Sequence, residues 1–331
     1  MEQKKILISL AVLFIIVGSI GTWFCTRDTL PDAIRIASGS IGGEYYKFGD
    51  ALEKKLRSRT SRPVKHIETT GTMENLRLLK EGVVEVALLQ SIVFPDLDNK
   101  ASSNNISVIA PLFLEPVVIL AHKGSGIESV YDMENRRVCI GPEESGTKKT
   151  SEDLLKFYEL NNKVTKVPEF FYDNSSHSHN DRNSCDAGIM VMGLSGPCFK
   201  EIGKITVQVI ELPYARALAG SKAFLAEFTL PEGVFARHSL PVLPHKNIQT
   251  VAYTALLAVR KDASSALVNE VLDAIYRTDL RINFSDLLPL KDAREWSEIP
   301  LNQTAQDYYN SMSQFFYLDT FSPSLFQIKV T

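Results

Sequence analysis

Short apolar stretches alternate along the chain with stretches whose apolar positions recur at helical spacing. Ile34 and Ile36 suit a buried strand, and Phe48, Leu52 and Leu56 then mark one face of a helix. The apolar spacing that follows predicts, in order, a strand at 64–68, a helix at 73–81 and a strand at 83–89. Strands that alternate with helices are typical of an α/β protein with a largely parallel sheet.

The apolar stretch 106–121 is expected to form one or two strands interrupted at Pro111 and Pro116. A second series of elements begins near Gly124. Its predicted strands are 137–140, 186–192, 206–212 and 251–260, and its predicted helices are 130–133, 148–160, 198–202, 214–220 and 263–277. The length of the chain, 331 residues, suggests about two domains.

Polar, glycine-containing turns follow at least four of the predicted strands. They are Gly39-Ser40, Thr70-Gly71-Thr72, Ser145-Gly146-Thr147 and Gly193 to Pro197. Ligands of open α/β sheets bind beyond the carboxyl ends of the strands. Turns of this kind from two sheets can face each other across a cleft, where their hydroxyl and N–H groups would hold a small polar ligand.

The first of these turns is rich in glycine and leads into a helix N-terminus, which favours anions because its first N–H groups lack intrahelical partners. The alternative is that Gly39, Gly42 and Gly43 serve packing alone. The order G-S-I-G-G-E matches neither the dinucleotide fingerprint nor the phosphate-binding loop of nucleotide-binding proteins.

The N-terminus carries an almost wholly apolar run, Ile6 to Phe24, behind Lys4 and Lys5. That length can cross a bilayer as a helix, and the flanking lysines place the N-terminus in the cytoplasm. We therefore expect an uncleaved transmembrane anchor over residues 1–29 and an exported body. A cleaved signal peptide is the alternative, although no A-x-A cleavage site is visible.

Charge and composition exclude several classes of function. The net charge of −3 argues against nucleic-acid binding, and the four cysteines form no C-x-x-C pair. Ser195 lies in G-L-S-G-P, which is not the G-x-S-x-G of hydrolases. No catalytic set and no cofactor motif emerges, so we expect no enzyme.

Two further groups of residues leave alternatives open. Cys185 and Cys198 either form a disulfide or remain two buried thiols, because sequence does not supply their Cα distance. His177 and His179 lie in a polar loop that either binds a metal or is simply solvated, and such short loops rarely make a complete site alone.

Six segments of the chain form an ordered series of motifs. They are IASGSIGGEYYKFGDAL, TTGTMENLRLLKEGVVEVALLQS, SGIESVYDMENRRVCIGPEESGT, DAGIMVMGLSGP, TVAYTALLAVRKD and the tail element IPLNQTAQDYY. In this order they resemble the solute-binding component of the TAXI branch of tripartite ATP-independent periplasmic (TRAP) transporters. The first segment has the G-S-T-G-G-T-Y-Y character of the family opening, and the third ends like the family's G-P-x-G-S-G-T. The likeness covers about residues 33–277.

The resemblance implies a bilobed periplasmic-binding-protein-like fold, in which two α/β lobes are joined by a hinge and close on a solute in the cleft between them. Lobe one would comprise 33–121 plus 250–331, and lobe two 122–249. The family binds small carboxylates or amino acids and passes them to TRAP membrane subunits. The protein would then lie on the periplasmic face of the inner membrane, or free in the periplasm if the N-terminal segment is cleaved.

The chain departs from the family pattern at three positions of these turns. Ile41 stands where Thr is frequent, and Glu144 stands where Gly is usual. Glu44 places a carboxylate beside the expected pocket, where it would either repel an anionic solute or pair with an amine of the ligand. The polar turns and the resemblance to the TAXI family together predict which residues bind the ligand. They are Ser40, Gly42, Gly43, Tyr45, Thr72, Asn75, Gln90, Ser145, Thr147 and Gly193.

These residues would donate hydrogen bonds to a ligand carboxylate and line the cleft. The alternative for Thr72, Ser145 and Thr147 is that each only caps its own helix. Tyr45 and Tyr46 are adjacent and point different ways, so that one is expected in the core and the other in the cleft.

Overall fold

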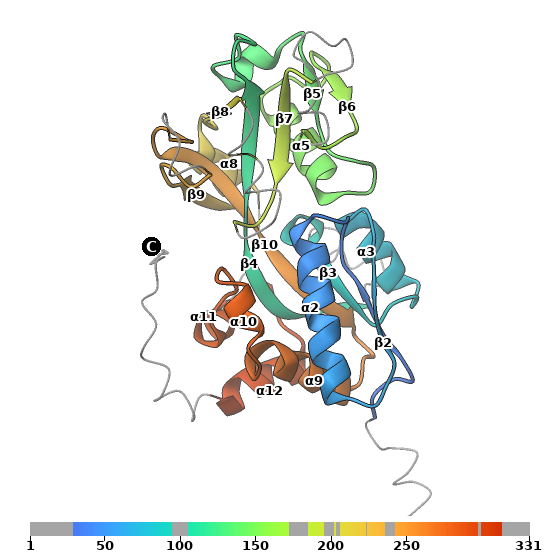
Figure 1. Cartoon of the computed structure of the whole chain (residues 1–331). Helices are drawn as coiled ribbons and strands as arrows, with labels where there is room; N and C mark the ends of the chain where they lie inside the picture. The colour runs from blue at the N-terminus through green and yellow to red at the C-terminus, as the bar shows by residue number, and fades with distance from the viewer. Residues whose placement is uncertain are drawn as a thin grey trace, which may run out of the picture.

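The computed structural model describes residues 29–94, 105–171, 185–194, 202, 206–222, 224–235, 242–296 and 299–312. The strands of these residues form one continuous sheet in the order β2-β1-β3-β10-β4-β7-β5-β6, with β8 paired to β4 and β9 to β10. Figure 1 shows two parts stacked on each other, and β4 (Ile106–His122) and β10 (Ile248–Arg260) run through both. This arrangement confirms the predicted α/β class.

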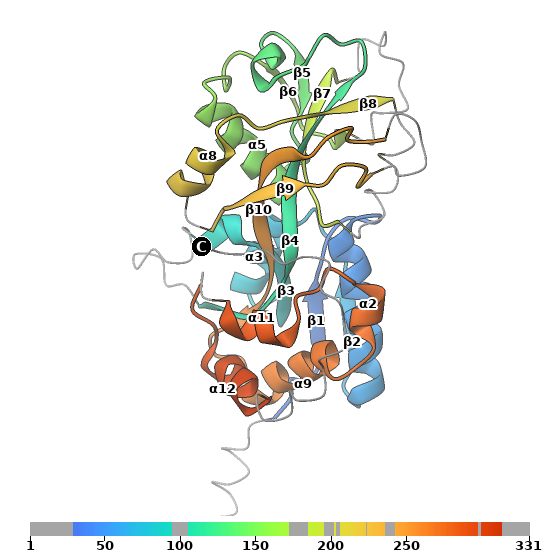
Figure 2. The ribbon, with the colours of Figure 1, turned by 90° about the vertical axis from the view of Figure 1, so that its left-hand side faces the viewer.

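The lower part in Figure 1 is built on three parallel strands, β1 (Ile34–Ala37), β2 (Val64–Ile67) and β3 (Val86–Gln90). Its helices are α2 (Glu44–Arg59), α3 (Thr72–Lys80), α9 (Ser265–Tyr276), α10 (Leu280–Asn283), α11 (Leu290–Glu295) and α12 (Gln303–Met312). Helices α2 and α9 bury their apolar faces on one side of the sheet, and α3 covers the other. Figure 2 shows that α9, α11 and α12 lie together on one side of the lower part.

The upper part in Figure 1 contains a second parallel set around the far half of β4. Its elements are β5 (Arg137–Cys139), β6 (Thr165–Val167), β7 (Ala187–Val191), β8 (Val207–Ile210), β9 (Ala226–Leu230), the 3₁₀ helices η1 (Ser91–Val93) at its border with the lower part and η2 (Val130–Met133), and helices α5 (Gly146–Phe157) and α8 (Ala215–Ser221). Strand β5 pairs in parallel with β6 and β7. Strand β4 pairs antiparallel with β7 and β8.

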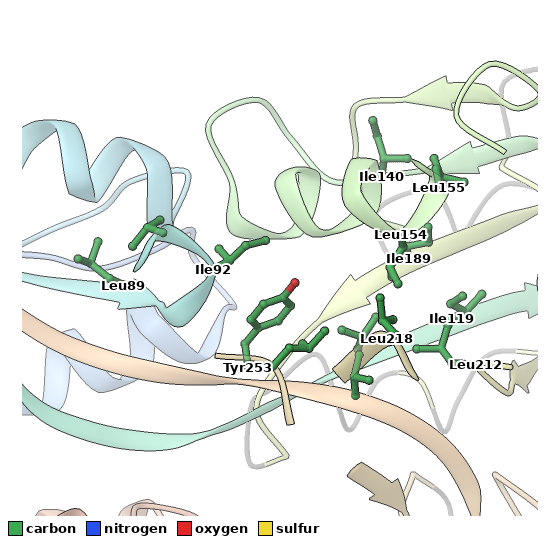
Figure 3. Close-up of a cluster of buried hydrophobic side chains, with 14 of the residues drawn as sticks. Leu89, Ile92, Ile119, Ile140, Leu154, Leu155, Ile189, Leu212, Leu218 and Tyr253 are labelled. Carbon is green, nitrogen blue, oxygen red and sulfur yellow. The ribbon is translucent and has the colours of Figure 1, made fainter. Parts of the chain in front are cut away.

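A single apolar cluster joins the two parts. Leu89 of β3 and Ile92 of η1 belong to the same buried cluster as Ile119 and Leu154 of the upper part. Figure 3 shows these side chains from both parts, with Tyr253 of β10 among them. Burial of this surface holds the two parts against each other, since removing apolar area from water is favourable.

The expectation that prolines interrupt 106–121 is wrong, because β4 is one strand through Pro111 and Pro116. Pro111 lies opposite Leu256, where the register with β10 shifts. Proline has no N–H to give to a ladder, and it is tolerated within a sheet at such irregularities. The strand therefore continues across both parts of the molecule.

The cysteine pairing also differs from the sequence alternatives. Cys185 forms a disulfide with Cys139, at a Cα–Cα distance of 5.7 Å. Cys139 ends β5 and Cys185 lies two residues before β7, and these two strands are parallel neighbours in the sheet. Strand adjacency thus brings together two cysteines that are 46 residues apart, and Cys185 is not available to Cys198.

Several predictions lie outside the described residues. They concern the segment Ile6 to Phe24, the loop with His177 and His179, and Ser195 and Cys198. Within the part of the chain that the structure describes, no helix is both long and apolar enough to cross a membrane.

Candidate functional site

A cavity of about 110 Å³ lies where the turns of the two parts meet. It is several times larger than the ~10–15 Å³ that one water molecule requires on the same measure. Its described lining residues come from turns at the carboxyl ends of parallel strands and from β4 and β7. They are Gly39, Ser40, Gly43, Glu44, Tyr45, Thr70, Gly71, Thr72, Gln90, Glu115, Ser145, Gly146, Thr147, Phe170, Met190, Val191, Met192 and Gly193.

The turn after β1 directs Tyr45 of α2 into the cavity. A side chain on Gly39 would place its Cβ 2.8 Å from the Cβ of Tyr45, so the close approach of this turn to α2 requires glycine. The Tyr45 hydroxyl donates a hydrogen bond of 2.8 Å to Oε2 of Glu115. Tyr46 instead packs edge-on against His66, with ring centroids 4.5 Å apart. Tyr45 is therefore the cavity residue of the pair.

Glu115 is a carboxylate in the middle of β4, at the level where the strand leaves the lower part. Its side chain is buried, and burial raises its pKa to about 7, against the opposing effect of hydrogen bonds from Tyr45 and Gln90. The Gln90 amide lies 3.5 Å from the same Oε2 atom. Burial and the charge of Glu115 also raise the pKa of the Tyr45 hydroxyl.

Glu44 is the first residue of α2 and the second buried carboxylate of the cavity wall. A Cβ on Gly193 would lie 1.7 Å from Oε2 of Glu44. The Glu44 carboxylate therefore lies against Gly193 in the turn after β7, and a side chain at position 193 would have to displace it. This contact closes one side of the cavity between the two parts.

Backbone hydrogen bonds close another side. The amides of Met73 and Glu74, in the first turn of α3, donate to the carbonyl of Glu144 in the upper part, at 3.0 and 3.3 Å. Thr150 of α5 donates to Oε1 of Gln90 at 3.2 Å. Protein groups of the opposite part thus already occupy donors at the N-terminus of α3 that would otherwise be open to an anion.

The structure brings most of the predicted binding residues together around the cavity. Those that line it are Ser40, Gly43, Tyr45, Thr72, Gln90, Ser145, Thr147 and Gly193. Gly42 is exposed, has a φ of 86°, and is not among the lining residues. Asn75 is fully buried beneath the turn, where its side-chain amide donates to the carbonyls of Ser38 and Leu88 at 2.6 and 2.7 Å.

The capping alternatives have different outcomes. Ser145 does cap α5, because its hydroxyl accepts a 3.0 Å hydrogen bond from the amide of Lys148, and it also lines the cavity. Thr72 does not act as the N-cap of α3, which is Gly71. Its hydroxyl accepts from the amide of Gln90 at 3.2 Å, and so links the α3 turn to the end of β3.

Sequence reasoning missed Glu115 and the apolar wall made by Phe170 and Met190 to Met192. A signal for Glu115 was present, since it is a lone acidic residue within an otherwise apolar stretch, and such residues are rarely buried unless they are paired. Among the described residues no group of three or more His, Cys, Asp or Glu side chains could hold a metal ion.

The comparisons with known proteins agree with this architecture. The model of the NMT1-like family matches residues 36–310. MatC from Rhodopseudomonas palustris, solved with bound malate, is 12% identical over 86% of this chain and 99% of that chain, with a TM-score of 0.52. A protein from Bordetella bronchiseptica RB50 is 14% identical over 85% of this chain and 81% of that chain, with a TM-score of 0.50.

A further similar structure is the alkanesulfonate-binding protein SsuA from Xanthomonas axonopodis pv. citri bound to MOPS, at 13% identity, 85% and 84% coverage and a TM-score of 0.49. Likeness at such identities is a likeness of fold, and it confirms the predicted periplasmic-binding-protein-like α/β fold. With 36–310 matched by the family model, the chain belongs to the NMT1-like family and has the fold of a solute-binding protein.

Proposed function

We propose that the protein is the extracytoplasmic solute-binding subunit of a TAXI-type TRAP transporter, and that it captures a small organic anion or amino acid in the cavity. The observation that carries this proposal is the position of the cavity. It lies at the carboxyl ends of parallel strands from both parts of the molecule, where α/β proteins bind small ligands. The described wall offers hydrogen-bonding groups but no catalytic combination of nucleophile and base.

The chemistry of the wall supports capture of a small polar molecule. The first turns of α2 and α5 border the cavity at Gly43 and Gly146, and such helix ends present N–H donors. Hydroxyl groups of Ser40 and Thr147 and the side chain of Gln90 add further polar contacts, while Met190 and Phe170 supply apolar surface. Concave sites of this mixed character are typical of small-molecule binding. MatC, which shares the fold, was solved with malate.

The assignment to the TAXI branch rests on the ordered motifs described above, from the glycine-rich turn at position 39 to the tail element near position 300. The apolar run Ile6 to Phe24 supports export and anchoring at the inner membrane. The disulfide between Cys139 and Cys185 supports an oxidising compartment. We propose two lobes, 33–121 plus 250–331 and 122–249, hinged where β4 and β10 pass between them.

A thermal-shift screen of the purified chain against amino acids and dicarboxylates tests solute capture. A ligand that binds only the folded state raises the melting temperature in proportion to the logarithm of its concentration. The shift should disappear in Thr147→Val, which removes a cavity hydroxyl at nearly constant shape. It should persist in Thr165→Val, on the exposed side of β6. A panel without any concentration-dependent shift would contradict the proposal.

The second candidate function is a membrane-anchored sensing module of the same fold, which reports the ligand to a partner without transport. Uptake of the radiolabelled solute by cells with and without the gene distinguishes the two functions. Loss of uptake on deletion, restored by the intact gene and not by one encoding Thr147→Val, supports the transporter subunit. Unchanged uptake supports the sensing module.

A further inference from the structure

Glu115 is a buried acid on a cavity wall whose described residues supply hydrogen-bond donors but no positive charge. Its exposed fraction is 5%, and it lines the cavity from the middle of β4. None of the described residues that line the cavity is Lys, Arg or His. Burying a carboxylate without a cationic partner is costly, and a group in this position becomes neutral by taking up a proton. The wall therefore favours the protonated form of this side chain.

The two oxygen atoms of the Glu115 carboxyl group have different surroundings. The Tyr45 hydroxyl donates to Oε2 at 2.8 Å, and the Gln90 amide lies 3.5 Å from the same atom. No group among the described residues donates a hydrogen bond to Oε1. Because donors already face Oε2, the proton of the neutral acid belongs on Oε1, which then becomes a donor itself. Protonated Glu115 thus adds an O–H group to the cavity wall.

The groups around Glu115 hold its proton at neutral pH. Burial raises the pKa of Glu115 to about 7, and the charge of Asp286, in the segment between α10 and α11, acts in the same direction. The hydrogen bonds from Tyr45 and Gln90 oppose this rise. A further negative charge in the cavity would add to the effect of Asp286, so that the proton would stay bound at higher pH.

Two tyrosines beside Glu115 keep their own protons over the same pH range. Burial and the charges of Glu115 and Glu44 raise the pKa of the Tyr45 hydroxyl. Tyr253 lies opposite Glu115 in the pairing of β10 with β4, and burial raises its pKa as well. Glu115 is therefore the member of this hydrogen-bonded group whose charge changes near neutral pH.

We propose that Glu115 binds the solute in its protonated form, as a hydrogen-bond donor to an anionic group of the ligand, so that capture takes up a proton from the solvent. The inference rests on the proposed function, because it concerns the ligand of that same cavity. A cavity of about 110 Å³ holds an anionic group close to Glu115. Two like unit charges roughly 6 Å apart, at an effective dielectric constant of about 20, weaken binding roughly a hundredfold. The ionised form of Glu115 thus rejects the anion that the protonated form accepts.

Titration calorimetry of the unmodified full-length chain measures this proton. Malate, aspartate and lactate are the probes, since their carboxyl groups stay ionised between pH 6 and 8. The probe that binds most tightly is titrated at pH 6, 7 and 8 in PIPES and in imidazole. These buffers have different ionisation enthalpies, so the difference between the two heats gives the number of protons taken up.

The expected values follow from the pKa of about 7 and a hundredfold weaker binding to the ionised form. Uptake should be about 0.8 proton per ligand at pH 8 and about 0.1 at pH 6, and the affinity should be about tenfold lower at pH 8 than at pH 6. Binding without proton uptake at pH 8, or with an affinity that rises with pH, overturns the inference and leaves solute capture intact. Absence of binding by these probes and by the whole thermal-shift panel rejects solute capture, and the inference with it.

Variants assign the proton to its side chain. Glu115→Gln has an amide that does not titrate, so uptake at pH 8 should vanish and the affinities at pH 6 and 8 should agree within about twofold. Glu152→Gln, at an exposed position of α5, is the matched control and should keep the pH dependence of the wild type. Proton uptake that persists in Glu115→Gln and is lost in Glu44→Gln would place the proton on Glu44 and overturn the inference.

Tyr45→Phe provides a second test if Glu115→Gln does not fold. The Tyr45 hydroxyl favours the charged form of Glu115, so its removal should raise the pKa of that carboxyl group further. The pH at which the affinity begins to fall should then move upward, whatever the affinity at pH 6. An onset that stays in place or moves to lower pH would contradict the assignment to Glu115.

Discussion

Replacing Glu115 with Gln should stabilise the ligand-free protein at neutral and higher pH. Burial holds the pKa of this carboxyl group at about 7 in the folded chain, whereas 4.5 is its ordinary value. Between these two pH values the unfolded chain has lost the proton and the folded chain retains it. The unfolded state therefore binds fewer protons, and the free energy of unfolding falls as pH rises through this window.

The size of the effect follows from the two pKa values. One pH unit corresponds to about 1.4 kcal/mol, so the interval from 4.5 to about 7 amounts to about 3 kcal/mol. The groups that face Glu115 are Tyr45 of α2 and Gln90 of β3, which favour its charged form, and Asp286, which opposes it. Gln at position 115 has no proton to lose, and its amide remains able to accept a hydrogen bond from Tyr45.

Guanidinium denaturation of the wild type and Glu115→Gln at pH 4.5, 5.5, 6.5, 7.5 and 8.5 measures this effect. The stability of the variant minus that of the wild type should rise by about 3 kcal/mol from pH 4.5 to above 7 and then stay constant. The same difference for Glu152→Gln, at an exposed carboxyl, should stay nearly flat over this window. A flat or falling difference for Glu115→Gln would refute the argument that burial keeps this group protonated.

Three further substitutions test other contacts of the site. Asn75→Ala should lower the free energy of unfolding by about 3 kcal/mol, because three buried hydrogen bonds are lost, and denaturant titration measures this. Cys139→Ser should cost about 4 kcal/mol, given the 46-residue separation of the bridged cysteines, and denaturation of the reduced wild type should give the same value. Gly193→Ala should weaken ligand binding at least tenfold in calorimetry, because its Cβ would meet Glu44, whereas Gly220→Ala, whose Cβ meets nothing within 4 Å, should not.

The local parts of the fold were predictable from the sequence. The turn after β1 and the start of α2 follow from adjacent glycines and a helical apolar pattern, and both arise from interactions between near neighbours in the chain. The same holds for α3, α5 and α9. Most of the predicted binding residues line the cavity because strand-end turns meet at the same edge of a parallel sheet.

The remaining features depend on contacts between distant segments. Glu115 reaches Tyr45 only because β4 runs antiparallel to β10 next to β3, and nothing within 106–121 specifies that neighbour. The pairing of Cys139 with Cys185 requires β5 and β7 to be adjacent. Strands β6 and β9 were missed because short edge elements carry too few residues for a periodic pattern.

The departures from the family pattern at positions 44 and 144 both affect the surroundings of the cavity. Glu44 adds a buried carboxylate to the wall that Glu115 already makes acidic. Glu144 has a φ of 58°, in the left-handed region where the glycine usual in the resembled family is unstrained. That backbone conformation aims the Glu144 carbonyl at the first turn of α3, and the side chain lies 3.6 Å from Arg77 of the same helix.

Because the ion pair with Arg77 is largely exposed, it contributes at most about 1 kcal/mol and does not by itself explain a strained residue at position 144. The carbonyl contact has the larger consequence, since it removes two donors from any anion in the cavity. The N-terminus of α3 therefore joins the two parts of the molecule, and its first two amides are not open to a ligand in this arrangement.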